Sequence, residues 1–275
     1  MSAAALAGDD PAKRPSEETP YVQTPQSVVD GMLRLGRVTG KDFLIDLGSG
    51  DGRIVITAAR RYGTRGYGVD YDPRLVKLAS ENARAAGVAG RAKFFERDVF
   101  KTDVGKATVL TMYLLPEYNQ ILRPRLYRQL RPGARIVSHD YDMGEWRPDA
   151  EIKVDAPDKP VGVEKSSKVF LWIVPARVEG RWRFNLPAGA DQRPHQHEVV
   201  LDLMQHYQDL SGIAHIGDRD IAIEQASLRG THISFDLRDG SDPIHFDGKV
   251  AGERISGKLS GPKGRSVNWR AVRAR

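Results

Sequence analysis

A glycine-rich segment, Asp46-Leu-Gly-Ser-Gly-Asp-Gly52, stands between an apolar run that favours a strand and one that favours a helix. Glycines at such a turn let the backbone bend sharply and leave no Cβ to block a ligand. Open α/β sheets bind ligands in the crevice beyond the carboxyl ends of their strands. Asp46 puts a carboxylate at that strand end, where it suits an ammonium group better than a phosphate. The segment therefore predicts a site for a ligand with a cationic group.

The dinucleotide-binding pattern G-x-G-x-x-G is the nearest rival, and the segment departs from it. Counted from Gly48, the sixth position is Arg53, and Gly52 falls one place early. Asp51 would also repel a pyrophosphate. A ligand with a sugar, a cationic amino-acid tail and no phosphate fits better, and S-adenosylmethionine is such a ligand. An ordinary glycine-rich turn is the structural alternative.

A second carboxylate follows at a distance that suits a nucleoside. Asp70 ends Gly68-Val-Asp70, 24 residues after Asp46, which is close to the ~20-residue spacing of a ribose-binding acid. A carboxylate there can accept hydrogen bonds from both ribose hydroxyls. Tyr71 is a candidate to lie against the adenine, with simple packing as the alternative.

A third carboxylate, Asp98, follows the next expected strand. It is predicted to accept a hydrogen bond from the exocyclic amine of adenine, with Val99 or Phe100 lining the ring. Its order after the two earlier motifs distinguishes it from an ordinary loop acid.

Helical and strand patterns alternate around these motifs from Thr24 to about Ala176. Apolar residues at helical spacing predict helices over 27–35, 54–62, 73–86 and 117–130, the last broken or kinked near Pro124. Short apolar runs predict strands over 43–47, 66–69, 93–95, 107–113 and 134–138, and a final hairpin of 151–154 with 169–174. Asp72 is predicted to cap the helix that begins at Pro73. Strands separated by helices imply a mostly parallel α/β sheet covered on both faces.

Beyond Ala176 the pattern changes to alternation with a period of two, divided by turns rich in Gly and Asp. Alternating apolar residues mark strands around 182–186, 199–203, 221–223, 233–237, 244–246 and 267–271. This spacing predicts seven or eight short antiparallel strands that close into a small barrel or a sandwich. Trp182 and Trp269 are expected in the core of this second, β-rich domain of residues 177–275.

The composition is that of an ordinary globular protein, with 40% hydrophobic and 28% charged residues among 275. The net charge of +6 is spread thinly: 27 basic and 23 acidic residues up to Ala176, and 15 and 13 beyond it. No dedicated nucleic-acid surface is therefore expected. With no cysteine, disulfides and thiolate metal sites are excluded, and no metal site is expected.

Targeting signals are weak. No apolar run approaches the ~20 residues that a membrane-spanning helix needs. Residues 1–20 are rich in Ala, Pro and charge and are predicted to form a disordered leader. Cytoplasmic location is the default prediction, with an exported form whose signal has been trimmed as the alternative.

Together these motifs resemble class I S-adenosylmethionine-dependent methyltransferases. The resemblance is closest to the branch with archaeal broad-specificity protein lysine methyltransferases and the mitochondrial ATP-synthase c-subunit lysine methyltransferase. It covers residues 21–176, which would form a Rossmann-like class I methyltransferase sheet, and stops before the β-rich remainder. The residues that carry it are Tyr21-Val-Gln-Thr-Pro25, Asp46 to Ile54, Gly68-Val-Asp70, Tyr113-Leu-Leu-Pro116, and Pro132-Gly133 with Ser138-His139. Gln23 departs from the proline expected in the first of these elements.

The resemblance implies S-adenosylmethionine as the cofactor and a role for each motif around it. Asp46, Gly48 and Gly50 would border its methionine part. Asp70 would hold the ribose and Asp98 the adenine.

At the other end of the cofactor, the resemblance implies that Tyr21 and Thr24 close over it near the transferring methyl. Tyr113 begins the segment that takes the place of the Asn/Asp-Pro-Pro-Tyr motif of enzymes that methylate DNA amines and glutamine. No amide or acid stands at its first position, which argues against those acceptors and is compatible with a free aliphatic amine. Tyr113 is the candidate for ordering the acceptor. His139 and Asp140 resemble an acid–base pair, although a histidine at a strand end is more often structural.

The leading interpretation is an enzyme that methylates lysine side chains of a protein substrate. One alternative is a methyltransferase for a small molecule. The other is a non-catalytic S-adenosylmethionine-binding protein whose β-rich part engages a partner. The sequence leaves open the acceptor, the number of methyl groups, a general base, the role of the β-rich part and the oligomeric state.

Overall fold

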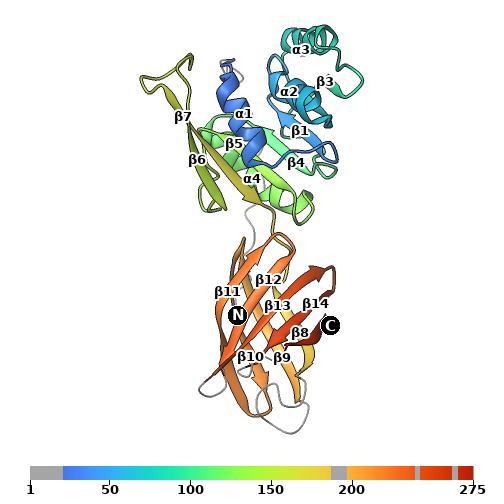
Figure 1. The fold of residues 1–275 in the computed structure, drawn as a ribbon, viewed down its shortest axis with the longest axis vertical. Helices are drawn as coiled ribbons and strands as arrows, with labels where there is room; N and C mark the ends of the chain where they lie inside the picture. Colours follow the sequence, from blue (N-terminus) through green and yellow to red (C-terminus); the bar gives the residue numbers. More distant parts are fainter. Residues whose placement is uncertain (1–20, 187–196, 239–241, 262–265, 275) are drawn as a thin grey trace.

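The computed structural model describes residues 21–186, 197–238, 242–261 and 266–274. The predicted leader, residues 1–20, lies outside the described residues. The described chain forms an α/β sheet unit followed by a closed β-barrel (Figure 1).

A seven-stranded sheet in the order β3-β2-β1-β4-β5-β7-β6 forms the first unit. Strands β1 to β5 pair in parallel, whereas β7 runs antiparallel to both β5 and β6. The predicted parallel sheet with a final hairpin is thus confirmed. Because the strand order reverses between β1 and β4, a crevice opens beyond their carboxyl ends. The strands are β1 (Phe43–Leu47), β2 (Arg65–Asp70), β3 (Ala92–Glu96), β4 (Val109–Met112), β5 (Arg135–His139), β6 (Ala150–Asp155) and β7 (Ser166–Ile173).

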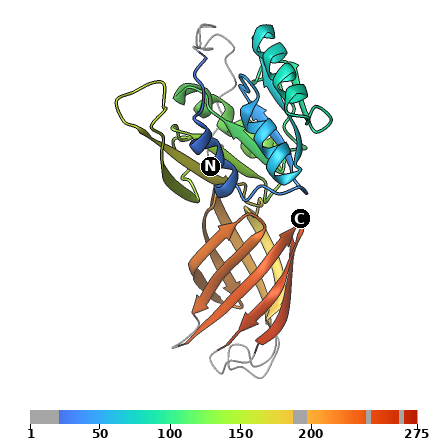
Figure 2. The ribbon, with the colours of Figure 1, turned by 45° about the horizontal axis from the view of Figure 1, so that its top comes forward.

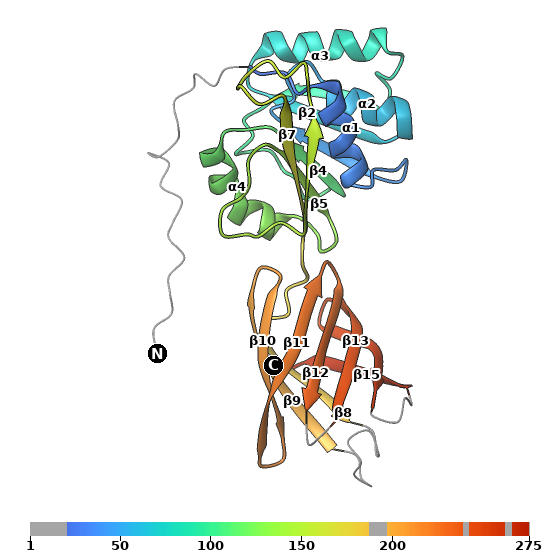
Figure 3. The same ribbon diagram turned by 60° about the vertical axis from the view of Figure 1, so that its left-hand side comes forward.

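Helices cover both faces of this sheet (Figure 3). Leu44 of β1 packs in the core shared with α1, α2 and α3, whereas its neighbour Ile45 packs in the core shared with α4. Alternate strand residues point to opposite faces, so both must be apolar. The helices are α1 (Gln26–Leu35), α2 (Arg53–Tyr62), α3 (Pro73–Ala85) and α4 (Pro116–Gln129). None of the helices in the described ranges is long and apolar enough to cross a membrane.

Two local predictions can be compared with these helices. Asp72 caps α3 as predicted, since its Oδ1 accepts a hydrogen bond from the Arg74 backbone N–H at 2.8 Å. The expected break at Pro124 does not occur, because α4 continues through it to Gln129. Pro124 removes one backbone hydrogen bond, but the buried Leu122 and Leu126 on either side hold the helix on the sheet.

The barrel consists of eight antiparallel strands in which each strand pairs with the next and β15 closes onto β8. This decides between the predicted barrel and sandwich. Trp182 and Trp269 lie in the core as expected, and Phe235 stacks on Phe246 with ring centroids 4.8 Å apart. Large side chains thus fill the interior. The strands are β8 (Gly180–Leu186), β9 (His197–His206), β10 (Asp209–Ile216), β11 (Arg219–Arg229), β12 (His232–Arg238), β13 (Pro243–Ala251), β14 (Arg254–Ser260) and β15 (Ser266–Arg273).

Two of these strands, β10 and β14, carry no clear alternation of large apolar residues. Gly212 on β10 and Gly257 on β14 stand where neighbouring backbones approach. A Cβ at Gly212 would lie 2.5 Å from the Asp202 carbonyl oxygen, and one at Gly257 would lie 1.9 Å from that of Asp247. Close approach selects glycine there and removes the apolar signal.

The barrel joins the sheet at the edge opposite to the crevice. The last residue of β7, Ile173, pairs with Arg135, the first residue of β5, so the chain leaves at the amino ends of the parallel strands. Tyr207 of the barrel stacks on Trp146 with centroids 5.1 Å apart and meets Tyr127 edge-on. These aromatic contacts hold the barrel away from the crevice.

Candidate active site

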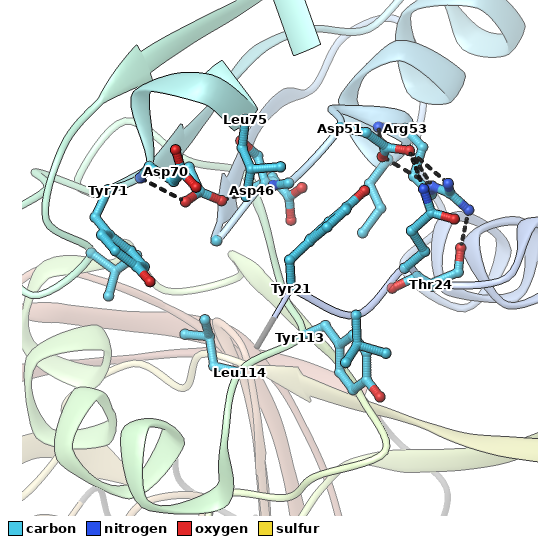
Figure 4. A pocket seen from close by; sticks show the side chains of 18 of the residues that line it. Tyr21, Thr24, Asp46, Asp51, Arg53, Asp70, Tyr71, Leu75, Tyr113 and Leu114 are labelled. Carbon is cyan, nitrogen blue, oxygen red and sulfur yellow. Dashed lines mark hydrogen bonds and ion pairs between the residues drawn. The ribbon is translucent and has the colours of Figure 1, made fainter. Parts of the chain in front are cut away.

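A cavity lies beyond the carboxyl ends of β1, β2 and β4 (Figure 4). Its walls come from the segment before α1, the glycine loop, the start of α3 and the segment after β4. The lining residues all fall between Tyr21 and Tyr118, so no described residue of the barrel contributes to it.

The glycine loop forms the floor of the cavity. Gly48 and Gly50 have φ angles of +72° and +53°, a conformation that glycine adopts at little cost. A Cβ at Gly50 would lie only 2.4 Å from Cε2 of Tyr21. The backbone N–H groups of Gly48 and Ser49 both donate to the Val69 carbonyl oxygen at 2.9 Å. These two hydrogen bonds fix the loop to the end of β2, and the backbone of Gly50, which has no side chain, lies against the Tyr21 ring.

Asp46 is a buried carboxylate at the end of β1, 2% exposed. Its Oδ1 accepts a hydrogen bond from the Thr111 hydroxyl at 2.7 Å. Burial raises the pKa of Asp46 to about 8, helped by the nearby charges of Asp70 and Asp51 and opposed by the Thr111 bond. A cation that enters the cavity would stabilise the ionised form of Asp46, which burial otherwise disfavours.

Asp70, at the end of β2, organises the loop as well as lining the cavity. Its Oδ2 accepts from the Gly50 backbone N–H at 2.9 Å, and its Oδ1 accepts from that of Asp72 at 3.1 Å. Burial raises the pKa of Asp70, and these backbone hydrogen bonds oppose the shift. The carboxylate joins β2, the loop and the start of α3.

The segment before α1 is fastened over the loop by Arg53. The Arg53 guanidinium forms a fork with Asp51, with Nη2 2.6 Å from Oδ2, and its Nη1 donates to the Thr24 carbonyl oxygen at 2.7 Å. Tyr21 is thereby held against Gly50. The contact joins residues 29 positions apart, and the closing of Tyr21 and Thr24 over the cofactor stays a prediction.

The segment after β4 forms the opposite wall with Tyr113 and Leu114. The Tyr113 ring packs on the His139 ring with centroids 3.9 Å apart. His139 is buried and does not line the cavity; its Nδ1 lies 3.2 Å from Thr24 Oγ1 and its Nε2 2.9 Å from Ser167 Oγ. His139 therefore connects Tyr113 to the segment before α1, a positioning role.

We expect His139 to make the fold sensitive to acid. Burial lowers the pKa of His139 below its usual value, so the folded protein keeps it neutral. Its stabilising effect is complete above the unfolded pKa of about 6.5 and is lost as the pH falls through the lower folded value. The difference in Tm between wild type and His139→Gln should shrink as the pH falls from 7 to 5. Parallel curves over this range would remove His139 as the titrating group.

The structure brings nearly all the predicted site residues together. Those that line the cavity are Tyr21, Thr24, Asp46, Gly48, Gly50, Asp70, Tyr71, Val99 and Tyr113. Asp98 is not among them. Its Oδ1 accepts from the Phe100 backbone N–H at 2.7 Å and so shapes the loop that presents Val99. Its hydrogen bond to adenine stays a prediction.

Several residues that line the cavity were not assigned to the site from the sequence, and three of them, Ser49, Arg53 and Leu114, have contacts that shape it. Ser49 has a buried hydroxyl that finds no partner in the part of the chain that the structure describes. Arg53 anchors the segment before α1, and Leu114 packs where a Cβ of Gly48 would lie, 2.7 Å from its Cδ2. Ser49 and Arg53 belong to the glycine motif itself, so the motif contained them, but nothing in the sequence assigned them these contacts.

The charges of the cavity favour a cation without phosphate. Two arginines line it, but Arg53 pairs with Asp51 and Arg74 with Asp72. Asp46 and Asp70 have no cationic partner among the described residues. With the unpartnered Ser49 hydroxyl, they fit the ammonium and sugar hydroxyls of S-adenosylmethionine and do not suit a pyrophosphate.

Comparison with known proteins agrees with this geometry. The model of the ANTKMT methyltransferase domain family matches residues 46–150. The protein-lysine N-methyltransferase of Saccharolobus islandicus is 42% identical over 137 residues, which make up 50% of this chain and 85% of that relative. The chain belongs to this methyltransferase family. The predicted resemblance is confirmed.

Two further proteins are similar to the same part of this chain. The mouse adenine nucleotide translocase lysine N-methyltransferase is 35% identical over 137 residues, 49% of this chain and 58% of that relative. A solved RNA methyltransferase from Salinibacter ruber, in complex with S-adenosyl-L-homocysteine, has 50% sequence identity and a TM-score of 0.51. The match covers 57% of this chain and 96% of that one. This methyltransferase uses S-adenosylmethionine, as predicted.

Proposed function

We propose that this methyltransferase N-methylates lysine side chains of a protein substrate. The observation that carries the proposal is the wall at Tyr113, where an aromatic ring and Leu114 replace the amide or acid that polarises a planar amine. The names of the Saccharolobus and mouse relatives support the same acceptor. An apolar, aromatic wall suits the aliphatic stem of a lysine.

Bound in the cavity, S-adenosylmethionine supplies a methyl group activated by its sulfonium, and methyl transfer leaves S-adenosylhomocysteine. The protein has to align the amine and exclude water, tasks for Tyr21 and Tyr113 on either side of the loop. A lysine ammonium has an ordinary pKa of about 10.4 and must lose its proton to become a nucleophile. Desolvation beside a cation would lower that pKa and so reduce the need for a strong protein base.

The test is to incubate the full chain with methyl-labelled S-adenosylmethionine and a cell lysate, then to locate the label by mass spectrometry. Asp46→Asn serves as the matched control that should lose the cofactor. Label on lysine Nζ supports the proposal. Label on a metabolite, or cofactor binding without transfer, would contradict it in favour of a small-molecule enzyme or a binding protein.

A second candidate acceptor is RNA, because the Salinibacter ruber structure carries that name at 50% identity. The same incubation decides it when portions of the product are digested with ribonuclease or with protease. Label that ribonuclease releases would move the assignment from lysine to a nucleotide.

We expect Asp70→Ala to weaken S-adenosylmethionine binding by about 1.5–3 kcal/mol, the contribution of a hydrogen bond to a charged group. The loss includes the Gly50 N–H bond that orders the loop. Calorimetric titration measures it, and Glu81→Ala, which removes an exposed acid of α3 that does not line the cavity, is the control. Unchanged affinity in folded Asp70→Ala would exclude Asp70 from the site.

A further inference from the structure

Cations and acids are unevenly distributed over the outer surface of the barrel. The chain beyond Ala176 is almost balanced, with 15 Lys and Arg against 13 Asp and Glu. This near-balance of the whole segment does not mean that the charges are evenly placed. Alternate residues of each strand point to the outside of the barrel, and different strands carry different numbers of cations and acids there.

Four adjacent strands, β13, β14, β15 and β8, carry five exposed cations, whereas the exposed Arg229 and Arg238 stand on β11 and β12. These adjacent strands run side by side in Figure 2 and pair through an unbroken ladder. Apolar neighbours of these cations along the strands, such as Val250, Ile255 and Leu259, are buried, so the cations point outward. We call this set the basic face: Arg183, Lys249, Arg254, Lys258 and Arg270.

The pairing register places these cations in rows across the strands. Lys249 pairs with Ser256, which pairs with Arg270, and so two cations flank one serine. Arg254 and Arg183 flank Val272 in the same way one row along. Strands lie ~4.8 Å apart, so the backbones of each pair of cations are about 10 Å apart.

One acid, Asp247, lies within the basic face, directly opposite Lys258 in the register between β13 and β14. None of its five cations forms an ion pair with another described residue, and the acid on these strands, Asp247, lies 3.0 Å from His232 instead. The other outward residues there are mainly uncharged and polar: Asn185, Ser256, Ser260, Ser266 and Asn268. Five of the described acids of the barrel lie on β9, β10 and β11, at Glu198, Asp202, Asp209, Asp220 and Glu224, and β11 also carries Arg219 and Arg229.

This composition distinguishes between kinds of partner. Protein interfaces depend on buried aromatic or large apolar anchors, and the basic face offers only Val272. Single-stranded nucleic acid binds by stacking its bases on aromatic rings, and the aromatic residues of these strands, such as Trp269, are buried inside. Arg and Lys with Ser and Asn are the donors that contact phosphates along a duplex.

We propose that the basic face binds the phosphate backbone of a duplex nucleic acid. The barrel interior is filled and its attachment is remote from the cavity, so this surface acts as a docking site independent of methyl transfer. The net charge by itself predicted no such surface. Folding collects the cations that the sequence spreads over 88 positions, from Arg183 to Arg270.

The experiment titrates the full chain with a fluorescent 20-base-pair RNA duplex and, in parallel, a DNA duplex of the same sequence, at several salt concentrations. Five phosphate contacts predict a slope of log K against log salt of about −4.5. Lys258→Gln with Arg270→Gln should weaken binding at least about ten-fold at low salt and reduce the slope by about 2. If the RNA duplex binds more tightly than the DNA duplex, the basic face recognises A-form geometry. If the two bind equally, it recognises only the phosphate backbone that both duplexes share.

Lys41→Gln with Arg60→Gln is the matched control, since both residues are exposed on the sheet unit and change the net charge equally. It should leave the affinity and the slope unchanged. Equal loss in both double variants, or no binding at low salt, would overturn the proposal. Displacement of the duplex by an equal charge concentration of polyglutamate would also overturn it, in favour of an acidic protein.

Discussion

Replacing Asp46 with asparagine should abolish most of the affinity for S-adenosylmethionine. The variant keeps the shape and an acceptor for the Thr111 hydroxyl but leaves the ammonium of the ligand without a carboxylate. Removing one partner of a buried ion pair costs about 3–5 kcal/mol, which corresponds to a Kd raised roughly 150- to 5,000-fold. Calorimetric titration measures the loss, and an unchanged Kd in a folded variant would contradict the role of Asp46.

The pKa of Asp46 adds a signature that a shape defect would not produce. Because burial raises this pKa to about 8, most of the unliganded protein holds a proton there at pH 7. A cationic ligand favours the ionised form, so binding at pH 7 should release nearly one proton to the buffer. Titrations in buffers with different ionisation enthalpies count it, and the affinity should rise from pH 6 to 7.5. Asp46→Asn should show neither effect.

The same carboxyl group affects the stability of the unliganded fold. Its folded pKa lies above its unfolded value, so its contribution is fully present below the unfolded pKa and is lost as the pH rises through about 8. The Tm of Asp46→Asn, measured without cofactor, should therefore gain on that of wild type as the pH rises from 6 to 8. A constant difference would mean that another group titrates in this range.

Replacing Tyr113 with alanine should lower kcat by about 100-fold while cofactor affinity stays within a few-fold of wild type. The ring packs against His139 and forms the wall opposite Tyr21, and a displacement of about 1 Å between reacting groups can cost that factor. Single-turnover kinetics on a protein whose lysine this enzyme methylates separates the rate of methyl transfer from cofactor binding.

Tyr113→Phe tests whether the ring or the hydroxyl matters. Burial raises the pKa of Tyr113 to about 12, with the charge of Asp140 acting in the same direction, so the phenol stays protonated at working pH and does not act as a base. We expect Tyr113→Phe to retain most of the activity with an unchanged pH profile. Equal losses in Tyr113→Phe and Tyr113→Ala would show that the hydroxyl, and not the ring, orders the acceptor.

The candidate site was predictable where its residues are close in sequence to a strand end. Asp46, Gly48 and Gly50 belong to one turn, and their conformations follow from local backbone geometry. Asp70 was placed by its spacing, since a crossover of ordinary length brings the next strand end alongside the first.

Contacts between distant segments were harder to predict. The hydrogen bond from Arg53 to the Thr24 carbonyl oxygen joins residues 29 positions apart, and the contact between the Thr24 hydroxyl and the His139 ring joins residues 115 positions apart. Neither pair has a periodic signal, because each forms only after the sheet has aligned its carboxyl ends. The unpartnered hydroxyl of Ser49 likewise depends on what packs around it.

By itself the sequence determined the order of helices and strands, the glycine turn with its carboxylates, and the change to β structure after Ala176. These are encoded by residues that are neighbours along the chain. Only the tertiary structure decided that the eight strands close into a barrel and that the chain enters this barrel from the amino end of β5. It also decided that Lys249 and Arg270 flank the same serine on the outer surface. These features depend on strand register and handedness, which bring together side chains that no local pattern relates.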